Sequence, residues 1–121
     1  MSEESFQRAV QLFNKREFFE CHEALEEVWM PERGARRLFL QGLIHLAVGF
    51  HHSQRGNLEG ASRQLRKGLY KLNAYLPTCE GIDTARLYGE VLSVLDRVEE
   101  GGMIADYPQI HTSCGSSSRR P

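Results

Sequence analysis

The most apolar stretch of the sequence, Leu38–His52 (LFLQGLIHLAVGFHH), limits the fold more than any other feature. On a helix, at about 100° per residue, its apolar side chains cover almost the whole circumference, and such a helix is buried on most sides. One narrow polar strip interrupts it, formed by Gln41, His45 and His52, which fall within about 40° of one another. The stretch is shorter than the ~20 residues that span a bilayer. We therefore predict a central buried helix with a polar seam, and no membrane partner.

The composition is that of one water-soluble globular domain. The chain has 121 residues, of which 40% are hydrophobic and 26% charged, which suits a modest core. A net charge of -1 does not by itself favour a polyanionic partner. The first residues, MSEESF, lack the basic and apolar regions of a signal peptide, so we predict a cytoplasmic protein. The chain has three cysteines, Cys21, Cys79 and Cys114. An odd number of cysteines without CxxC spacing matches neither a disulfide framework nor a zinc finger.

Apolar residues at helical spacing predict an all-α chain, because no segment alternates with the period of a strand. The expected helices cover residues 3–14, 17–29, 35–54, 57–76 and 83–100. Gly56 and Pro77 are helix stops, and Asn57 and Asp83 are N-caps. Residues 103–110 should pack as an arm. The polar, Ser-rich residues 111–121 are expected to form a disordered tail.

A weak internal repeat relates residues 15–29 to residues 55–69, with an offset of 40 residues. Each copy follows an apolar helix, so the pattern indicates two helical hairpins. Two copies are too few for a solenoid, which needs about three. We predict a single all-helical domain over residues 1–110, a compact bundle of about five helices in which the last helix closes two hairpins.

Three ordered motifs resemble a known family: HEALEEVW (22–29), LQGLIHLAVGFHH (40–52) and RGNLEGA (55–61). They resemble the bacterial and archaeal "domain of unknown function" family numbered 309. The resemblance implies a small helical cytoplasmic protein and no established activity. The motif residues of the family correspond here to His22, Glu23, Glu26, Trp29, Gln41 and Gly42.

The strongest candidate site combines the second and central helices. His22 and Glu26 are four residues apart, so their side chains can meet on one helix face. If the two helices pack antiparallel, this pair can face the polar seam, with Gly42 and Gly49 permitting close approach. The candidate site is then His22, Glu23, Glu26, Trp29, Gln41, His45 and His52. The indole N–H of Trp29 should bond to a carboxylate or a main-chain carbonyl.

Three interpretations of this site stay open. One is a buried hydrogen-bond network, because buried His and Gln need partners. Another is a divalent metal site for zinc, manganese or iron, with His22, Glu26 and His45 as candidate ligands. The third is acid–base catalysis without a metal. The second histidine of HExxH is absent, which excludes the metalloprotease motif.

A second candidate surface is basic. Its residues are Arg63, Arg66, Lys67 and Lys71, with Arg55, Arg36 and Arg37 nearby. Such a face can bind phosphates, but a solvated helix face explains it better, so nucleic acid is not the favoured partner. The acidic second helix offers another explanation, in which acidic and basic faces pair between chains of a homo-oligomer.

These patterns leave two function hypotheses. We favour a non-enzymatic binding or interaction module with a His/Glu/Gln polar network, because no catalytic signature is complete. The alternative is a small metal-dependent hydrolase centred on His22 and Glu26.

Overall fold

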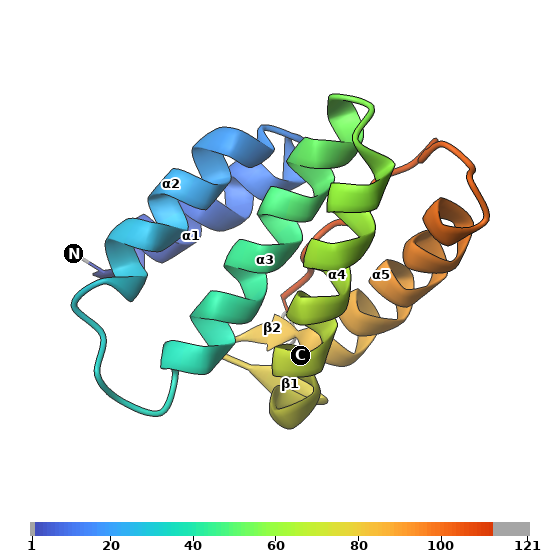
Figure 1. Cartoon of the computed structure of the whole chain (residues 1–121). Coiled ribbons are helices and arrows are strands. Elements are labelled where there is room, and N and C mark those ends of the chain that lie inside the picture. Colours follow the sequence, from blue (N-terminus) through green and yellow to red (C-terminus); the bar gives the residue numbers. More distant parts are fainter. Residues whose placement is uncertain (1, 113–121) are drawn as a thin grey trace, which may run out of the picture.

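The computed structural model describes residues 2–112, which form a helical domain with a very small sheet (Figure 1). Its helices are α1 (Ser2–Asn14), α2 (Phe18–Trp29), α3 (Arg37–Gln54), α4 (Leu58–Leu72) and α5 (Thr84–Glu99), with a 3-10 turn at Asn73–Tyr75. Strands β1 (Thr78–Cys79) and β2 (Ile82–Asp83) pair antiparallel. The predicted all-α bundle is confirmed. The sheet was not predicted, because strands of two residues have no periodicity to detect.

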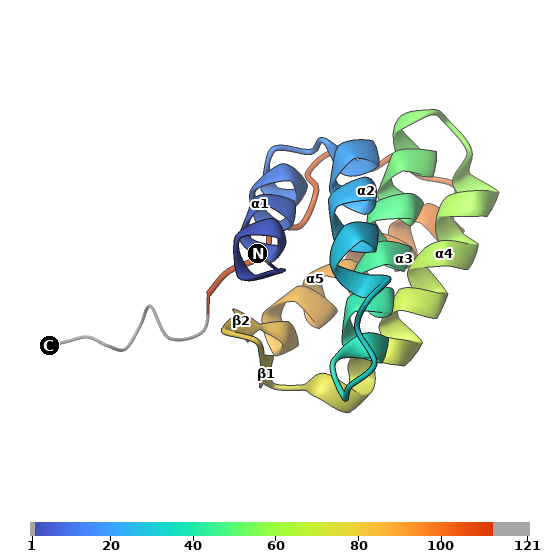
Figure 2. The same ribbon diagram turned by 90° about the vertical axis from the view of Figure 1, so that its left-hand side faces the viewer.

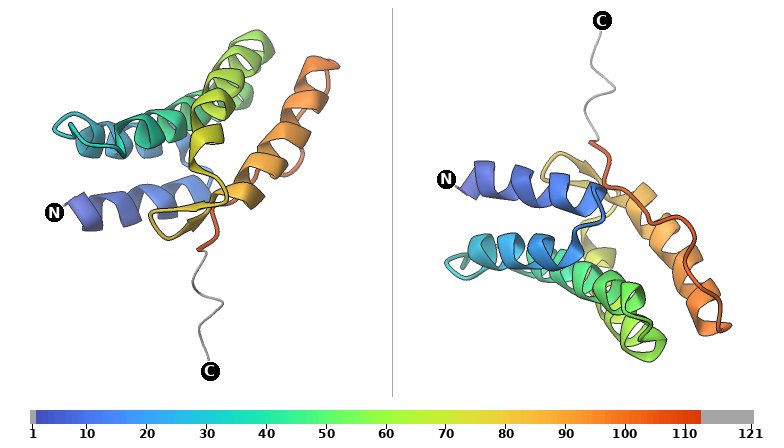
Figure 3. Two further views of the ribbon diagram at one scale, coloured as in Figure 1. Left: turned by 90° about the horizontal axis from the view of Figure 1, so that it is seen from below. Right: turned by 90° about the horizontal axis from the view of Figure 1, so that it is seen from above.

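The helices pack in two layers. Figure 1 and Figure 2 show α2, α3 and α4 side by side, with α1 behind α2 and α5 behind and beside α4. Both views in Figure 3 agree with this arrangement. The α3–α4 pair makes the most extensive helix contact, and α1–α2 and α2–α3 follow. The two predicted hairpins are therefore α1–α2 and α3–α4.

The predicted helix ends are mostly correct, for the expected reasons. Gly56 has a φ of 83° and ends α3. Asn57 accepts a 2.9 Å bond from the Gly60 amide, and Asp83 accepts a 3.0 Å bond from the Arg86 amide. Because these caps supply partners for otherwise unpaired N–H groups, α4 and α5 begin beside them.

Helix α4 ends at Leu72, four residues before its predicted end at Leu76. Leu76 precedes Pro77 and adopts extended geometry, with φ -87° and ψ 153°, as residues before proline generally do. The sheet turn that follows contains Glu80 (φ 54°) and Gly81 (φ 76°). Two successive positive φ values match a tight hairpin turn.

The core is built around α3, as predicted. Its buried side chains include Phe39, Leu40, Leu43, Leu46 and Phe50, all at 0% exposure. One residue of the predicted buried stretch differs: Leu38 is 54% exposed.

The segment from 103 to 112 packs against the helices as an arm. The Tyr107 ring lies 5.3 Å from Phe18 and 5.5 Å from Phe50, between ring centroids. The Ile110 amide donates to Asn14 Oδ1 at 2.7 Å, and Asn14 Nδ2 donates to the Ile110 carbonyl at 3.0 Å. The arm therefore ties the bundle to the end of α1.

The arm ends in contact with the sheet. Thr112 forms an antiparallel bridge with Ile82, and the Asp83 amide donates to the His111 carbonyl at 2.8 Å. The predicted tail began at residue 111, so its first two residues pair with β2, and residues 113–121 lie outside the described part. Among residues 2–112, no helix combines the length and apolarity that crossing a membrane requires.

Candidate functional site

His22 and Glu26 form the first part of the predicted site. They lie on one face of α2, and His22 Nε2 is 3.2 Å from Glu26 Oε2. Their side chains are 24% and 48% exposed. The Phe19 ring lies next to them, 5.9 Å from the His22 ring and 5.4 Å from the His51 ring. The pair is therefore at the rim of the α2–α3 contact, and it is not a buried network.

The histidines of the polar seam of α3 form their hydrogen bonds on the side that faces α4. His45 Nδ1 lies 2.8 Å from Gln64 Oε1 of α4. His52 Nδ1 lies 3.4 Å from the side-chain nitrogen of Asn57, the N-cap of α4. The prediction that these histidines face α2 is therefore wrong. Two histidines of the candidate site bond to α4 and its cap, away from His22 and Glu26.

The charges around His45 agree with this placement. Burial lowers the pKa of His45, the hydrogen bond that His45 donates to the Gln64 side-chain oxygen opposes that effect, and the nearby charges of Lys71 and Lys67 lower the pKa further. His45 therefore favours its neutral form next to the basic side of α4. His51, on the α2 side, also has a lowered pKa, mainly from burial and then from Arg55.

The glycines of α3 explain why the seam faces α4. A Cβ on Gly49 would lie 2.9 Å from Leu65 Cδ2, and a Cβ on Gly42 would lie 3.1 Å from Leu72 Cγ. Gly68 on α4 completes the contact, since its Cβ would be 2.9 Å from the Gly42 carbonyl oxygen. These glycines permit close approach of α4. The prediction that they admit α2 is wrong.

The structure thus brings together one pair of the candidate residues. Glu23 is exposed and Gln41 is half-buried. Within residues 2–112, no three or more His, Cys, Asp or Glu side chains are grouped so that they could hold a metal ion. A functional role of any of these residues stays a prediction.

Trp29 has an unexpected environment. Its Nε1 is buried without a hydrogen-bond partner in the described chain, so the predicted carboxylate or carbonyl partner is absent there. The Arg37 guanidinium lies 4.0 Å from the centroid of the indole ring. Arg37 also donates to the carbonyls of Trp29 (3.0 Å) and Glu32 (2.7 Å). Arg37 therefore stabilises the α2–α3 loop, a role that spacing alone does not reveal.

Arg36 is also structural. Its guanidinium lies 4.0 Å from the Glu32 carboxylate and 3.7 Å from the Glu80 carboxylate, and 5.7 Å from the centroid of the Phe6 ring. The side chain is mostly covered. Arg36 and Arg37 therefore do not belong to the exposed basic surface, which is reduced to α4 and Arg55.

Of the basic residues of α4, Arg63, Arg66 and Lys67 are exposed and Lys71 is half-buried. Arg63 lies 3.4 Å from Glu59, and Arg66 pairs with Glu99 of α5. Lys67 forms no ion pair with any residue in the described part of the chain. Across α3, the outward residues of α2 are acidic: Glu20, Glu23, Glu26 and Glu27. The layer therefore has an acidic edge and a basic edge.

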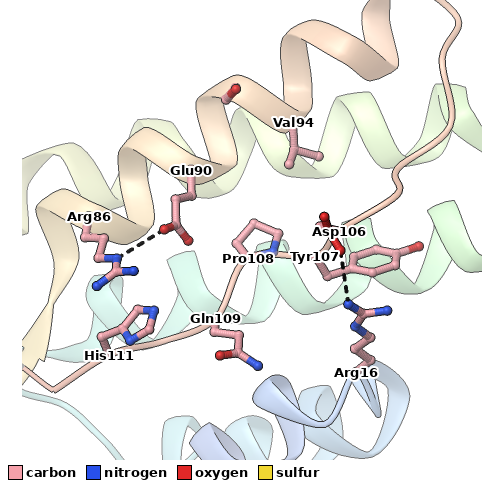
Figure 4. Close-up of a pocket in the computed structure, with 10 residues that line it drawn as sticks. Arg16, Arg86, Glu90, Val94, Asp106, Tyr107, Pro108, Gln109 and His111 are labelled. Atoms are coloured by element: carbon pink, nitrogen blue, oxygen red, sulfur yellow. Dashed lines mark hydrogen bonds and ion pairs between the residues drawn. The ribbon is translucent and has the colours of Figure 1, made fainter.

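A cleft of about 500 Å³ lies between α5 and the arm, and the sequence did not predict it (Figure 4). Figure 4 shows Arg86 beside Glu90 and Arg16 beside Asp106. The distances are 3.1 Å and 3.8 Å. Because both cations already have a carboxylate neighbour, no unpaired charge converges in the cleft. Its residues come from three distant segments, which no local motif connects.

Cys21 is a core residue, as predicted. Burial raises the pKa of its thiol to about 12, so the reactive thiolate is scarce at neutral pH. Burial also raises the pKa of Cys79, and the charge of Glu80 raises it further. Cys114 lies outside the described residues.

Comparison with known proteins confirms the family resemblance. Residues 6–64 match the model of the family described as "Domain of unknown function (DUF309)". The chain is similar to "Uncharacterized protein YpuF" of Bacillus subtilis (strain 168), at 36% identity over 94 residues. The match covers 74% of this chain and 53% of YpuF. The chain therefore spans about half the length of this curated relative.

Proposed function

We propose that this relative of uncharacterised proteins is a non-enzymatic binding module, and that it binds through the outer face of α2, α3 and α4. The outer face is the set of exposed or half-buried side chains on the uncovered side of this layer. Its members, all exposed or half-buried, are Phe19, Glu23, Glu26, Glu27, Met30, Leu38, Gln41, His45, Val48, Arg63, Lys67 and Tyr70.

The observation that carries the proposal is the apolar exposure of this layer. Phe19 is 44% exposed, Met30 64%, Leu38 54% and Tyr70 84%. Among the described residues, only two other large apolar side chains are as exposed, Leu92 on α5 and Met103 after it. Aromatic residues and Met are enriched in protein interfaces. A layer that exposes three of them, together with Leu38, among charged residues has the composition of a binding surface.

The polar groups of the layer also support binding over catalysis. His22 lies against Glu26 and His45 bonds to Gln64, on opposite sides of α3. A reaction needs a nucleophile, a base and a charge stabiliser around one point. These residues are paired separately and do not converge.

A photo-crosslinking amino acid tests the face. We expect the crosslinker at Tyr70 to give protein adducts in cells, whereas the same group at Leu92 on α5 serves as the control and gives few. Equal adducts from both positions, or none from Tyr70, would refute the proposal.

The alternative, a metal-dependent hydrolase, has a direct test. It requires a third ligand beside His22 and Glu26, and the described residues provide none in reach. The measurement is metal content of protein purified without a polyhistidine tag. Stoichiometric metal that disappears in His22→Ala would overturn the binding-module proposal.

A further inference from the structure

The internal repeat places equivalent residues of α2 and α4 at the same level of the bundle. Both helices flank α3 and run antiparallel to it (Figure 1). Near one end, Phe19 of α2 lies against His51 of α3, and a Cβ on Gly60 of α4 would lie 3.1 Å from the ring of His52. Residue n of α2 is therefore level with about residue n+40 of α4, which is also the offset of the repeat.

Opposite charges occupy the equivalent exposed positions. The repeat aligns Glu23 with Arg63, Glu26 with Arg66, Glu27 with Lys67, and Met30 with Tyr70. Two acidic positions of the outer face, Glu23 and Glu27, thus match two basic positions at the same levels on the other edge. The third pair is already engaged within the chain, since Glu26 lies 3.2 Å from His22 and Arg66 pairs with Glu99 of α5. The apolar residues Met30 and Tyr70 match in the same way.

We propose that the outer face binds a second copy of this chain, as a dimer whose two-fold axis lies parallel to α3. This inference rests on the proposed binding face and names its partner. Rotation about this axis brings α2 of each copy onto α4 of the other copy. Each residue keeps its position along the axis. Glu23 then meets Arg63 of the second copy, and Met30 meets its Tyr70. Each contact occurs twice, as a two-fold interface requires.

Charge selects this axis over its alternative. A two-fold axis in the interface but perpendicular to α3 would place α2 on α2, with Glu23 and Glu27 facing glutamates. It would also place α4 on α4, with Lys67 facing basic residues. Like charges brought together in an interface cost several kcal/mol. Of the two axes, only the one parallel to α3 places each acidic edge against a basic edge.

The central helix suits a position on the axis. There, α3 packs on α3 of the second copy. Each outward residue of α3 then lies at the level of the same residue in the second copy. Residues 38–54 contain no Asp, Glu, Lys or Arg. Leu38 and Val48 supply apolar contact, and their pairing with themselves carries no repulsion.

The face is large enough for a stable dimer. Helices α2, α3 and α4 have 12, 18 and 15 residues, which at ~1.5 Å per residue gives about 18, 27 and 23 Å. At about 10 Å of width per helix, each copy offers about 700 Å². Standard interfaces bury about 600–1,000 Å² per partner. Existing pairs do not block it, because Arg63 and Glu59 are 59% and 87% exposed and such surface pairs are weak.

Charge reversal tests the dimer by sedimentation or light scattering at about 100 μM. We expect the full wild-type chain to be dimeric. Reversing the acidic edge (Glu23→Arg with Glu27→Lys) or the basic edge (Arg63→Glu with Lys67→Glu) should weaken the dimer at least about tenfold. An equimolar mixture of the two variants should restore a one-to-one dimer. The control is Asp96→Lys on α5 with Glu100→Lys just after it, which should stay dimeric.

Each other result overturns the inference. A monomeric wild type, a control that dissociates as much as the variants, or a mixture that stays monomeric would each refute it. Circular dichroism and thermal melting show that every variant is folded, so loss of the dimer is not loss of structure. If the wild type is monomeric and the crosslinker at Tyr70 captures a different protein, the dimer fails and the proposed binding face stands.

Disulfide trapping tests the axis. In a background with Cys79→Ser and Cys114→Ser, we expect Met30→Cys mixed with Tyr70→Cys to form a disulfide-linked heterodimer. Met30→Cys alone should not link to itself, because the parallel axis holds the two copies of residue 30 at opposite edges. Faster self-linking of Met30→Cys than mixed linking would contradict the parallel axis and refute the proposal.

Discussion

Gly68 gives the most direct test of the close contact between α3 and α4. In Gly68→Ala, the added Cβ would lie 2.6 Å from Leu46 Cδ2 and 2.9 Å from the Gly42 carbonyl oxygen. The Leu46 side chain can rotate away. The carbonyl belongs to the backbone of α3 and cannot, so the two helices must separate by a few tenths of an ångström.

Two opposing effects set the size of the change. Alanine is better than glycine inside a helix by about 0.8–1 kcal/mol, whereas overpacking a well-packed core costs about 1–3 kcal/mol. We therefore expect Gly68→Ala to lower the free energy of unfolding by about 1 kcal/mol. Gly89 in α5 is the matched control, because its added Cβ meets no atom within 4 Å. Gly89→Ala should raise the free energy of unfolding by about 0.8–1 kcal/mol.

Urea unfolding followed by far-UV circular dichroism measures both changes. With a slope of about 1–3 kcal/mol/M, a loss of 1 kcal/mol moves the midpoint down by about 0.3–1 M. Both variants are compared with wild type at one protein concentration, since dimerisation would make stability depend on concentration. If Gly68→Ala stabilises the protein as much as Gly89→Ala does, the close α3–α4 contact is wrong.

Three shorter predictions concern pH, a cap and the tryptophan. Because the pKa of His45 is lowered in the folded protein from its ordinary 6.5, the unfolded chain binds more protons, and stability should fall as the pH drops below about 6.5. Replacing His45 with Gln should reduce that slope in urea midpoints measured at pH 5.5 and 7.5; an unchanged slope would refute it. Asn57→Ala should cost about 1 kcal/mol, and no loss in urea unfolding would mean that the cap contributes nothing. Arg37→Ala should change the fluorescence of Trp29, since the guanidinium covers its ring; an identical spectrum would contradict this contact.

The helix boundaries could be predicted because local chemistry sets them. Gly56 ends α3 in a positive φ conformation that glycine adopts without strain, and Asp83 accepts the bond that starts α5. The sheet could not be predicted in the same way. Its turn holds Glu80 in a positive φ conformation, which glutamate seldom adopts and which the surrounding fold imposes.

The candidate site could be predicted only in part. The spacing of His22 and Glu26 correctly brought them together, because both lie on one helix. A helical projection gives directions around one helix, but it does not say which neighbour lies in each direction. The positions of the glycines indicate which helix approaches α3 closely. Helix α4 has Gly60 and Gly68 at positions that could face Gly42 and Gly49, whereas α2 has no glycine, so close approach favoured α4.

The contact of Tyr107 with Phe18 and Phe50 has a consequence for synthesis on the ribosome. Helices α1 to α4 are made first and can form their hairpins while Tyr107 has not yet been added. At about 5–20 residues per second, the stretch from Phe50 to Tyr107 takes several seconds to make. During that interval the two phenylalanines lack the ring that packs against both. Until the arm emerges, this side of Phe18 and Phe50 therefore stays open to chaperones or to other nascent copies.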